Sequence, residues 1–61
     1  MDRDKVTRLA MIINSAMEDV GTVVWHSVYG SYLPELRLPE NIERRYLELA
    51  KKKLEVALSL V

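Results

Sequence analysis

The chain lacks cysteine and contains a single histidine, His26. Without cysteine it can have neither a disulfide framework nor a cysteine-ligated zinc site. One histidine leaves few ways to assemble a nucleophile with its base, or a set of metal ligands. The Glu-x-x-His spacing of di-iron bundles is also missing, since Val23 stands three positions before His26. We therefore expect no enzymatic activity, no bound metal and no cofactor.

Net charge and long apolar runs are lacking as well. Nine Lys and Arg residues balance nine Asp and Glu residues, so the formal net charge is zero. General nucleic-acid binders are normally basic, and this balance disfavours that class. No stretch reaches the ~18 uninterrupted apolar residues of a membrane span. The mixed charges of residues 1–5 do not resemble a secretory signal. Together these features predict a soluble cytoplasmic protein without a membrane segment.

Small size makes self-association the first expectation. The chain has 61 residues, and 49% of them are hydrophobic, which is not the composition of a disordered tail. A chain of this length buries only about 60% of the surface that its unfolded form exposes. Small domains usually add disulfides, a metal or a partner subunit. Because the first two have little support in this sequence, a partner subunit is the favoured source of stability.

The first segment carries the pattern of an amphipathic helix, predicted over about residues 3–29. Asp2 or Asp4 can cap its N-terminus. Gly30 is expected to end it in the left-handed conformation that glycine tolerates. On a helical wheel of about 100° per residue the apolar side chains fall within about 160°. This arc contains Val6, Leu9, Ala10, Ile12, Ile13, Ala16, Met17, Val20, Val23, Val24 and Val28.

Residues 22–29 leave a second interpretation open. They are rich in β-branched and aromatic residues and lie between Gly21 and Gly30, a pattern that is also typical of a strand. The apolar arc nevertheless continues in phase across Gly21, which favours helix. A lone strand would also need a partner strand, and the sequence shows no second candidate.

A second helix is predicted over about residues 40–60, after a connecting loop at 30–39 that Pro34 and Pro39 keep from being helical. The apolar arc of this helix spans about 200°, which is wider than the stripe that one neighbouring helix covers. We therefore predict that residues 1–61 form one all-α domain. Its two-helix antiparallel hairpin would assemble as a homodimeric four-helix bundle, or as a higher oligomer.

Four large side chains are candidates for binding a protein partner: Met11, Trp25, Tyr29 and Tyr32. In the helical interpretation the first three lie off the apolar arc, and exposed side chains of these types mark interaction surfaces. The alternative is that they pack under the proline-containing loop or against the second copy. We predict a small non-catalytic interaction or oligomerisation module, such as a regulatory or accessory subunit. Its partners would be a second copy and a further, unidentified protein.

The alternative function is RNA or other nucleic-acid binding through Arg44, Arg45, Lys51 and Lys52. Dimerisation would double this basic face, and phosphates are the groups that it would contact. The simpler interpretation is a solvated helix face, because glutamates are interleaved with the basic residues. Intrahelical ion pairs are expected at the i,i+4 spacing. The candidate pairs are Glu40–Arg44, Glu48–Lys52 and Lys51–Glu55.

Lys53 agrees least with its surroundings, since it falls near the middle of the apolar arc of the second helix. An ammonium group there must either extend to solvent or pair with an acid. We favour extension to solvent at an edge of the helix. The alternative is a polar contact that fixes the register of the assembly, with Lys53 paired to Glu18 or Asp19.

Overall fold

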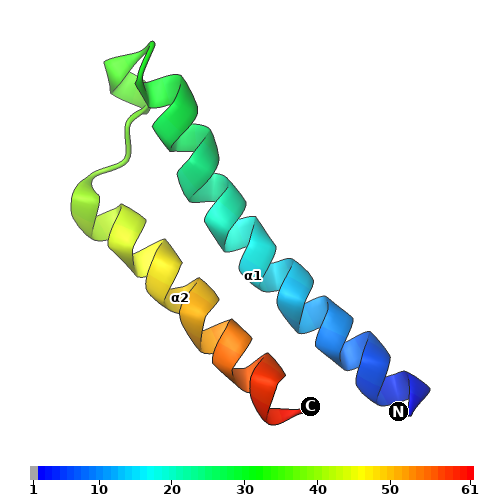
Figure 1. The fold of residues 1–61 in the computed structure, drawn as a ribbon. Coiled ribbons are helices and arrows are strands. Elements are labelled where there is room, and N and C mark those ends of the chain that lie inside the picture. Colours follow the sequence, from blue (N-terminus) through cyan, green and yellow to red (C-terminus); the bar gives the residue numbers. More distant parts are fainter. Residues whose placement is uncertain (1) are drawn as a thin grey trace.

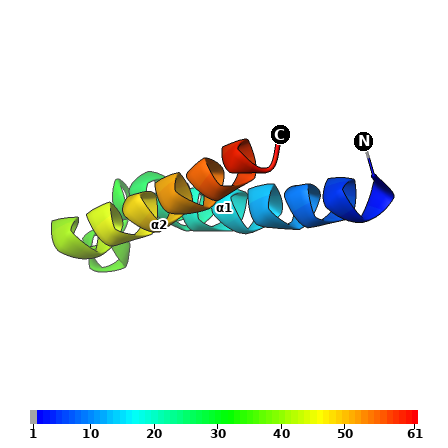
Figure 2. The ribbon, with the colours of Figure 1, turned by 90° about the horizontal axis from the view of Figure 1, so that it is seen from below.

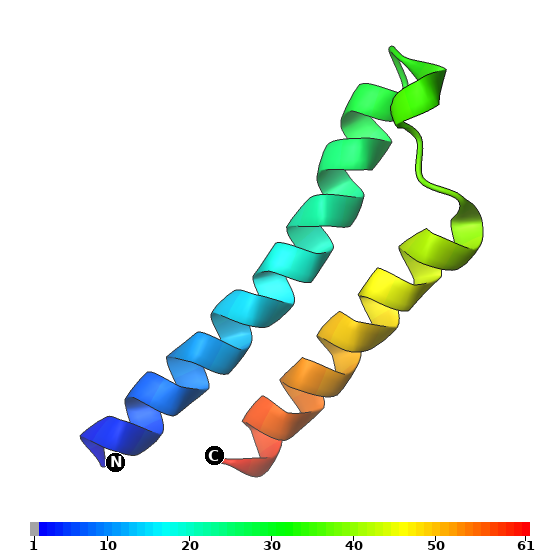
Figure 3. The same ribbon diagram turned by 180° about the vertical axis from the view of Figure 1, so that it is seen from behind.

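The computed structural model describes residues 2–61, which form an α-helical hairpin (Figure 1). Helix α1 comprises Arg3–Gly30 and helix α2 comprises Glu40–Ser59. A single 3₁₀ turn, Pro34–Leu36, lies in the connection between them. The helices run antiparallel and side by side, as the view from behind also shows (Figure 3). The prediction of an all-α hairpin is thus confirmed, and the strand alternative for residues 22–29 is wrong.

Both ends of α1 are closed by polar side chains. Asp2 is the N-cap, and its side chain accepts a hydrogen bond of 3.3 Å from the backbone N–H of Asp4. At the other end the Ser31 hydroxyl donates to the carbonyl of Val28 over 2.6 Å. These bonds satisfy backbone groups that have no partner inside a helix. Helix α1 is continuous over 28 residues and includes the central Gly21.

The predicted left-handed conformation of Gly30 is wrong. None of the described residues has a positive φ, α1 includes Gly30, and the C-cap Ser31 is right-handed, at φ −73° and ψ −25°. The structure gives another reason for glycine here, because the returning chain crosses it closely. A Cβ added at Gly30 would lie 3.0 Å from the Cα of Arg37 and 3.1 Å from its Cβ. Gly30 therefore makes room for the connection.

The connection packs back onto α1 through His26. Its ring Nδ1 donates to the carbonyl of Leu36 over 2.7 Å, which ties the 3₁₀ turn to the last turns of the helix. Two backbone hydrogen bonds close the turn itself. The N–H of Leu36 donates to the carbonyl of Leu33, and the N–H of Arg37 donates to the carbonyl of Pro34. This hydrogen bonding accounts for His26 as a structural residue.

The seam between α1 and α2 is built mainly from small residues. The buried apolar side chains are Ala16 and Val23 on α1 and Ala50 and Ala57 on α2, and Gly30 is buried as well. They recur at seven-residue intervals along each helix, as expected for one face of a packed helix pair. Small side chains let the helices lie close together, and they also leave the hairpin with a small core.

The hairpin is one layer of helices rather than a rounded domain (Figure 2). Its extents are 46 × 17 × 10 Å, and its radius of gyration is 14.3 Å. A compact domain of this length would have a radius of gyration of about 10.5 Å. The first turns of α1 also extend past the end of α2 (Figure 2). Two large sides of the layer are therefore open to solvent.

Candidate functional site

Each predicted apolar arc is divided between the seam and the solvent. On α1, Leu9, Ile12, Ala16 and Val23 face α2 and are buried or half-buried. The rest of that arc lies roughly 100° away around the helix and is exposed. On α2 a matching group of exposed side chains lies on the same side of the layer. We call these residues the apolar face: Val6, Ile13, Met17, Val20, Val24 and Val28 from α1, with Leu47, Leu54, Leu58 and Val61 from the second half of the chain.

Two grooves join the two helices across the apolar face. One has a volume of about 310 Å³ and is lined by Ala16, Met17, Val20, Gly21, Val24 and Leu54. The other has a volume of about 290 Å³ and is lined by Leu9, Ile13, Leu54, Ala57, Leu58 and Val61. No charged or hydrogen-bonding side chain lines either groove. Leu54 borders both, so it lies at the centre of the apolar face.

The exposed area of the hairpin is too large for its mass. Its accessible surface is 4992 Å². A compact monomeric protein of 7.1 kDa would expose about 4100 Å². The excess, about 900 Å², is close to the ~800 Å² that each partner buries in a standard protein–protein interface. The hairpin therefore exposes a surplus of surface about as large as one side of an interface, and the apolar face has the chemistry of a surface that a second layer covers.

Lys53 has a partner in the same chain. Its Nζ lies 2.6 Å from Oδ2 of Asp19, and the two side chains are 34% and 15% exposed. The favoured expectation, that Lys53 only extends to solvent, is therefore wrong. Pairing with Asp19, one of the two acids considered, is what the structure shows. The other acid, Glu18, accepts a 3.4 Å hydrogen bond from Asn14 Nδ2 instead. A role for Lys53 in the register of an assembly stays a prediction.

The four candidate partner-binding residues are not all brought together. The rings of Trp25 and Tyr29 lie 4.7 Å apart between centroids, and the Trp25 ring also meets the ring of His26 edge-on at 4.9 Å. Met11 is fourteen residues before Trp25, which is about 21 Å along the helix. Tyr32 lies beyond the end of α1 and is 79% exposed. Trp25 and Tyr29 thus form one exposed aromatic pair.

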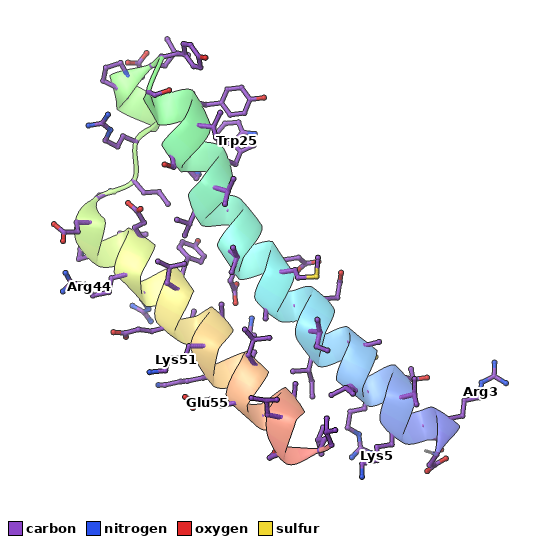
Figure 4. All side chains as sticks on the ribbon, viewed as in Figure 1. Arg3, Lys5, Trp25, Arg44, Lys51 and Glu55 are labelled. Carbon is purple, nitrogen blue, oxygen red and sulfur yellow. The ribbon has the colours of Figure 1, made fainter. Side chains whose placement is uncertain are left out.

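This aromatic pair lies outside the apolar face. Figure 4 shows Trp25 on the side of α1 that faces away from α2. A groove of about 420 Å³ beside it is lined by Glu18, Gly21, Thr22, Trp25 and His26. The pair is therefore available to a different partner from the one that covers the apolar face, and its role in binding stays a prediction.

The basic residues of α2 are exposed but lie in two separate pairs. At about 100° per residue, Arg44 and Lys51 lie on one side of the helix, while Arg45 and Lys52 lie roughly 100° away. Arg44 donates to Glu40 over 3.0 Å. This is the one predicted i,i+4 ion pair that forms within residues 2–61. A phosphate-binding role for these residues stays a prediction.

No family model, curated protein or solved structure matches the chain. Within residues 2–61 there is no cluster of three or more acidic or histidine side chains placed to hold a metal ion. Neither helix of the described chain has the length and apolar character needed to cross a membrane. The apolar face joins ten exposed apolar side chains from the two halves of the chain.

Proposed function

We propose that this protein is a non-catalytic self-association module, in which the apolar faces of two hairpins pack together as a four-helix bundle. The observation that carries the proposal is the apolar face itself, since it gathers exposed apolar side chains from both helices and its two grooves have no charged side chain in their lining. The hairpin as a whole exposes about 900 Å² more than a compact monomer of its mass, which is close to what one partner buries in a standard interface. A two-fold dimer uses the same patch on both copies, so one apolar face is sufficient.

Stability favours the same conclusion. The buried apolar side chains are three alanines and one valine, and no large side chain is fully buried. Ordering a chain costs about 1.5 kcal/mol per residue in conformational entropy. Burial of Ile13, Met17, Leu54 and their neighbours against a second copy would supply the apolar contacts that one hairpin does not make. Two layers packed around one core are the usual arrangement of a stable domain.

The experiment compares two leucines of α2 that are almost equally exposed. Leu54 is 44% exposed at the centre of the apolar face, and Leu49 is 41% exposed on the other flank of the helix. Leu54→Lys should convert the dimer to single chains and abolish cooperative unfolding, because an ammonium group would be buried between the layers. Leu49→Lys should preserve the dimer. Molecular mass and thermal unfolding of both variants test this.

Equal behaviour of the two variants would contradict the proposal. If both remain dimeric, the two copies meet somewhere other than the apolar face. If the unmodified chain is already a stable monomer, the self-association proposal fails as a whole.

The aromatic pair supports a secondary part of the proposal. Trp25 and Tyr29 lie beside the apolar face and not on it, so a bundle would leave them at its rim, where a further protein could bind them. Exposed aromatic residues are frequent anchors of protein interfaces. This arrangement is consistent with a regulatory or accessory subunit, and the aromatic pair is where the partner would bind.

Nucleic-acid binding by α2 is the alternative proposal, and it has less support. Arg44 is engaged by Glu40, and glutamates lie between the two basic pairs. RNA affinity that is measurable at low salt and falls steeply as salt is added would favour this alternative, because phosphate contacts release counterions.

A further inference from the structure

Basic and acidic residues alternate along one side of α2. We call this side the outer edge: Arg44, Glu48, Lys51 and Glu55, which lie within about 60° of one another on the helical wheel. Figure 4 shows Arg44, Lys51 and Glu55 on the side of α2 that faces away from α1. All four residues are exposed. The outer edge borders the apolar face, so it lies where the rim of an interface between two copies would be.

Most of these charges have no partner within the hairpin. The ion pairs within residues 2–61 are Arg44–Glu40 and Lys53–Asp19. Glu48, Lys51 and Glu55 take part in neither of them. The Arg44–Glu40 pair is highly exposed, and pairs of that kind contribute little to stability, so Arg44 can exchange its partner at small cost. The outer edge is thus free to interact with another chain.

The charges of the outer edge lie opposite unlike charges when the outer edge of a second α2 runs beside it in the opposite direction. Arg44 then lies opposite Glu55 of the second copy, and Glu48 lies opposite Lys51. Each pairing occurs twice in a two-fold dimer, which gives four attractive contacts. A parallel, in-register arrangement would instead place every charge opposite an identical one, which is unfavourable.

The leucines of α2 indicate nearly the same register. Leu47 and Leu54 belong to the apolar face, and in an antiparallel pair they can lie opposite each other across the two-fold axis. The charges place that axis between residues 49 and 50, and the leucines place it between residues 50 and 51. The two positions differ by one residue, which is about 1.5 Å along a helix. One antiparallel arrangement therefore satisfies both the Leu47–Leu54 contact and the charges of the outer edge.

A bundle with both loops at the same end would not pair the charges of the outer edge. If both loops lay at the same end, each α2 would meet α1 of the second copy at its outer edge. The corresponding edge of α1 consists of Arg3, Thr7, Asn14, Glu18, Gly21 and Trp25. Arg3 and Glu18 are its two charged residues, so it cannot match four alternating charges.

We infer that the partner of the apolar face is a second copy whose α2 lies antiparallel to the first α2, with the two loops at opposite ends of the bundle. This inference rests on the proposed self-association. It adds the orientation of the two copies and assigns the outer edge of α2 as the element that selects it. Charges at the rim of an interface set orientation and partner choice more than they set affinity.

The test uses two variants whose outer edges carry opposite charge. Arg44→Glu/Lys51→Glu makes the outer edge acidic throughout, and Glu48→Lys/Glu55→Lys makes it basic throughout. Each variant alone would face like charges, whereas a mixture would restore all four attractive contacts. We expect the heterodimer to be enriched about tenfold over the statistical mixture in native mass spectra at low salt, with the enrichment lost at high salt.

A matched control separates alignment from net charge. Arg45→Glu/Lys52→Glu makes the same change in charge on the same helix, roughly 100° from the outer edge. Mixed with the basic-edge variant, it offers the same long-range attraction without the aligned contacts. It should give no enrichment beyond a small general attraction. Equal enrichment in the two mixtures would overturn the assignment of the outer edge.

Orientation is measured directly by spin labels on Tyr32→Cys, the only cysteine that the chain would then contain. Asp19 contacts Lys53, so Thr22 lies level with Ala50 near the two-fold axis. Tyr32 is ten residues farther along, so two labels at opposite ends should be about 30 Å apart. Loops at the same end would give only the bundle width, roughly 10–15 Å.

The two proposals fail in different ways. A monomeric mass for the unmodified chain would contradict the self-association itself. A dimeric mass with a short distance between the labels would preserve the self-association and overturn the antiparallel pairing of α2.

Discussion

At the scale of single residues, the ion pair between Asp19 and Lys53 sets the alignment of α1 with α2 along their seam. Both groups lie in a row of alanines and valines, and their 2.6 Å contact is the only ion pair between the two helices of the described chain. Each charge compensates the loss of water around the other. The pair therefore fixes which turn of α1 lies beside which turn of α2.

Removing one partner should be worse than removing both. Lys53→Leu leaves the mostly buried Asp19 carboxylate without its counter-charge, and we expect the free energy of unfolding to fall by about 2 kcal/mol. The double variant Asp19→Leu/Lys53→Leu should regain most of that loss, because an apolar pair replaces a desolvated ionic one. Urea unfolding of the two single variants and the double variant gives the coupling energy. Additive effects would show that the contact is unimportant in solution.

Sequence reasoning could identify Lys53 but could not choose its partner. A lysine inside an apolar arc is conspicuous on a helical wheel. Glu18 and Asp19 differ by only about 100° around α1, and the choice between them depends on which side of α1 faces α2. That orientation is a property of the packed pair, and a single wheel does not contain it.

At the scale of elements, the two glycines of α1 have opposite roles. Gly21 is in the middle of the helix, and a Cβ added there would meet no atom within 4 Å. Gly30 ends the helix, and a Cβ added there would lie 3.0 Å from the Cα of Arg37 in the returning chain. Only the second site requires the absence of a side chain.

Alanine at these two positions should therefore have effects of opposite sign. Gly21→Ala should stabilise the protein by about 0.5–1 kcal/mol, since alanine favours helix and restricts the unfolded chain. Gly30→Ala should destabilise it by about 1–3 kcal/mol, because the connection must move. Thermal unfolding of the two variants at equal concentration provides the comparison. A loss of stability in Gly21→Ala would indicate that another chain approaches that backbone closely.

The helices themselves were largely predictable, and the details of their ends were not. Periodicity and the prolines locate both helices, and their last residues differ by one position from the prediction. The conformation of Gly30 was mispredicted because the reason for glycine lies seven residues away, in the chain that returns past it. Similarly, the apolar arcs predict how much of each helix is apolar, but only packing shows which part faces the seam and which part forms the apolar face.

At the scale of the whole molecule, the shape argues for a partner. One layer with a radius of gyration of 14.3 Å buries little apolar surface and leaves one side lined by valines, leucines and isoleucine. The prediction of a second layer came from the 200° arc of α2, and the structure shows why the arc is so wide. One part of it faces α1, another part belongs to the apolar face, and Leu49 and Val56 lie exposed on the other flank of the helix.

The most direct test of self-association is the mass of the unmodified chain in solution, measured by sedimentation equilibrium at micromolar concentration. The apolar face predicts a species of twice the 7.1 kDa chain mass, with a melting temperature that rises with protein concentration because folding is linked to association. A species of 7.1 kDa that unfolds cooperatively at a concentration-independent temperature would contradict it.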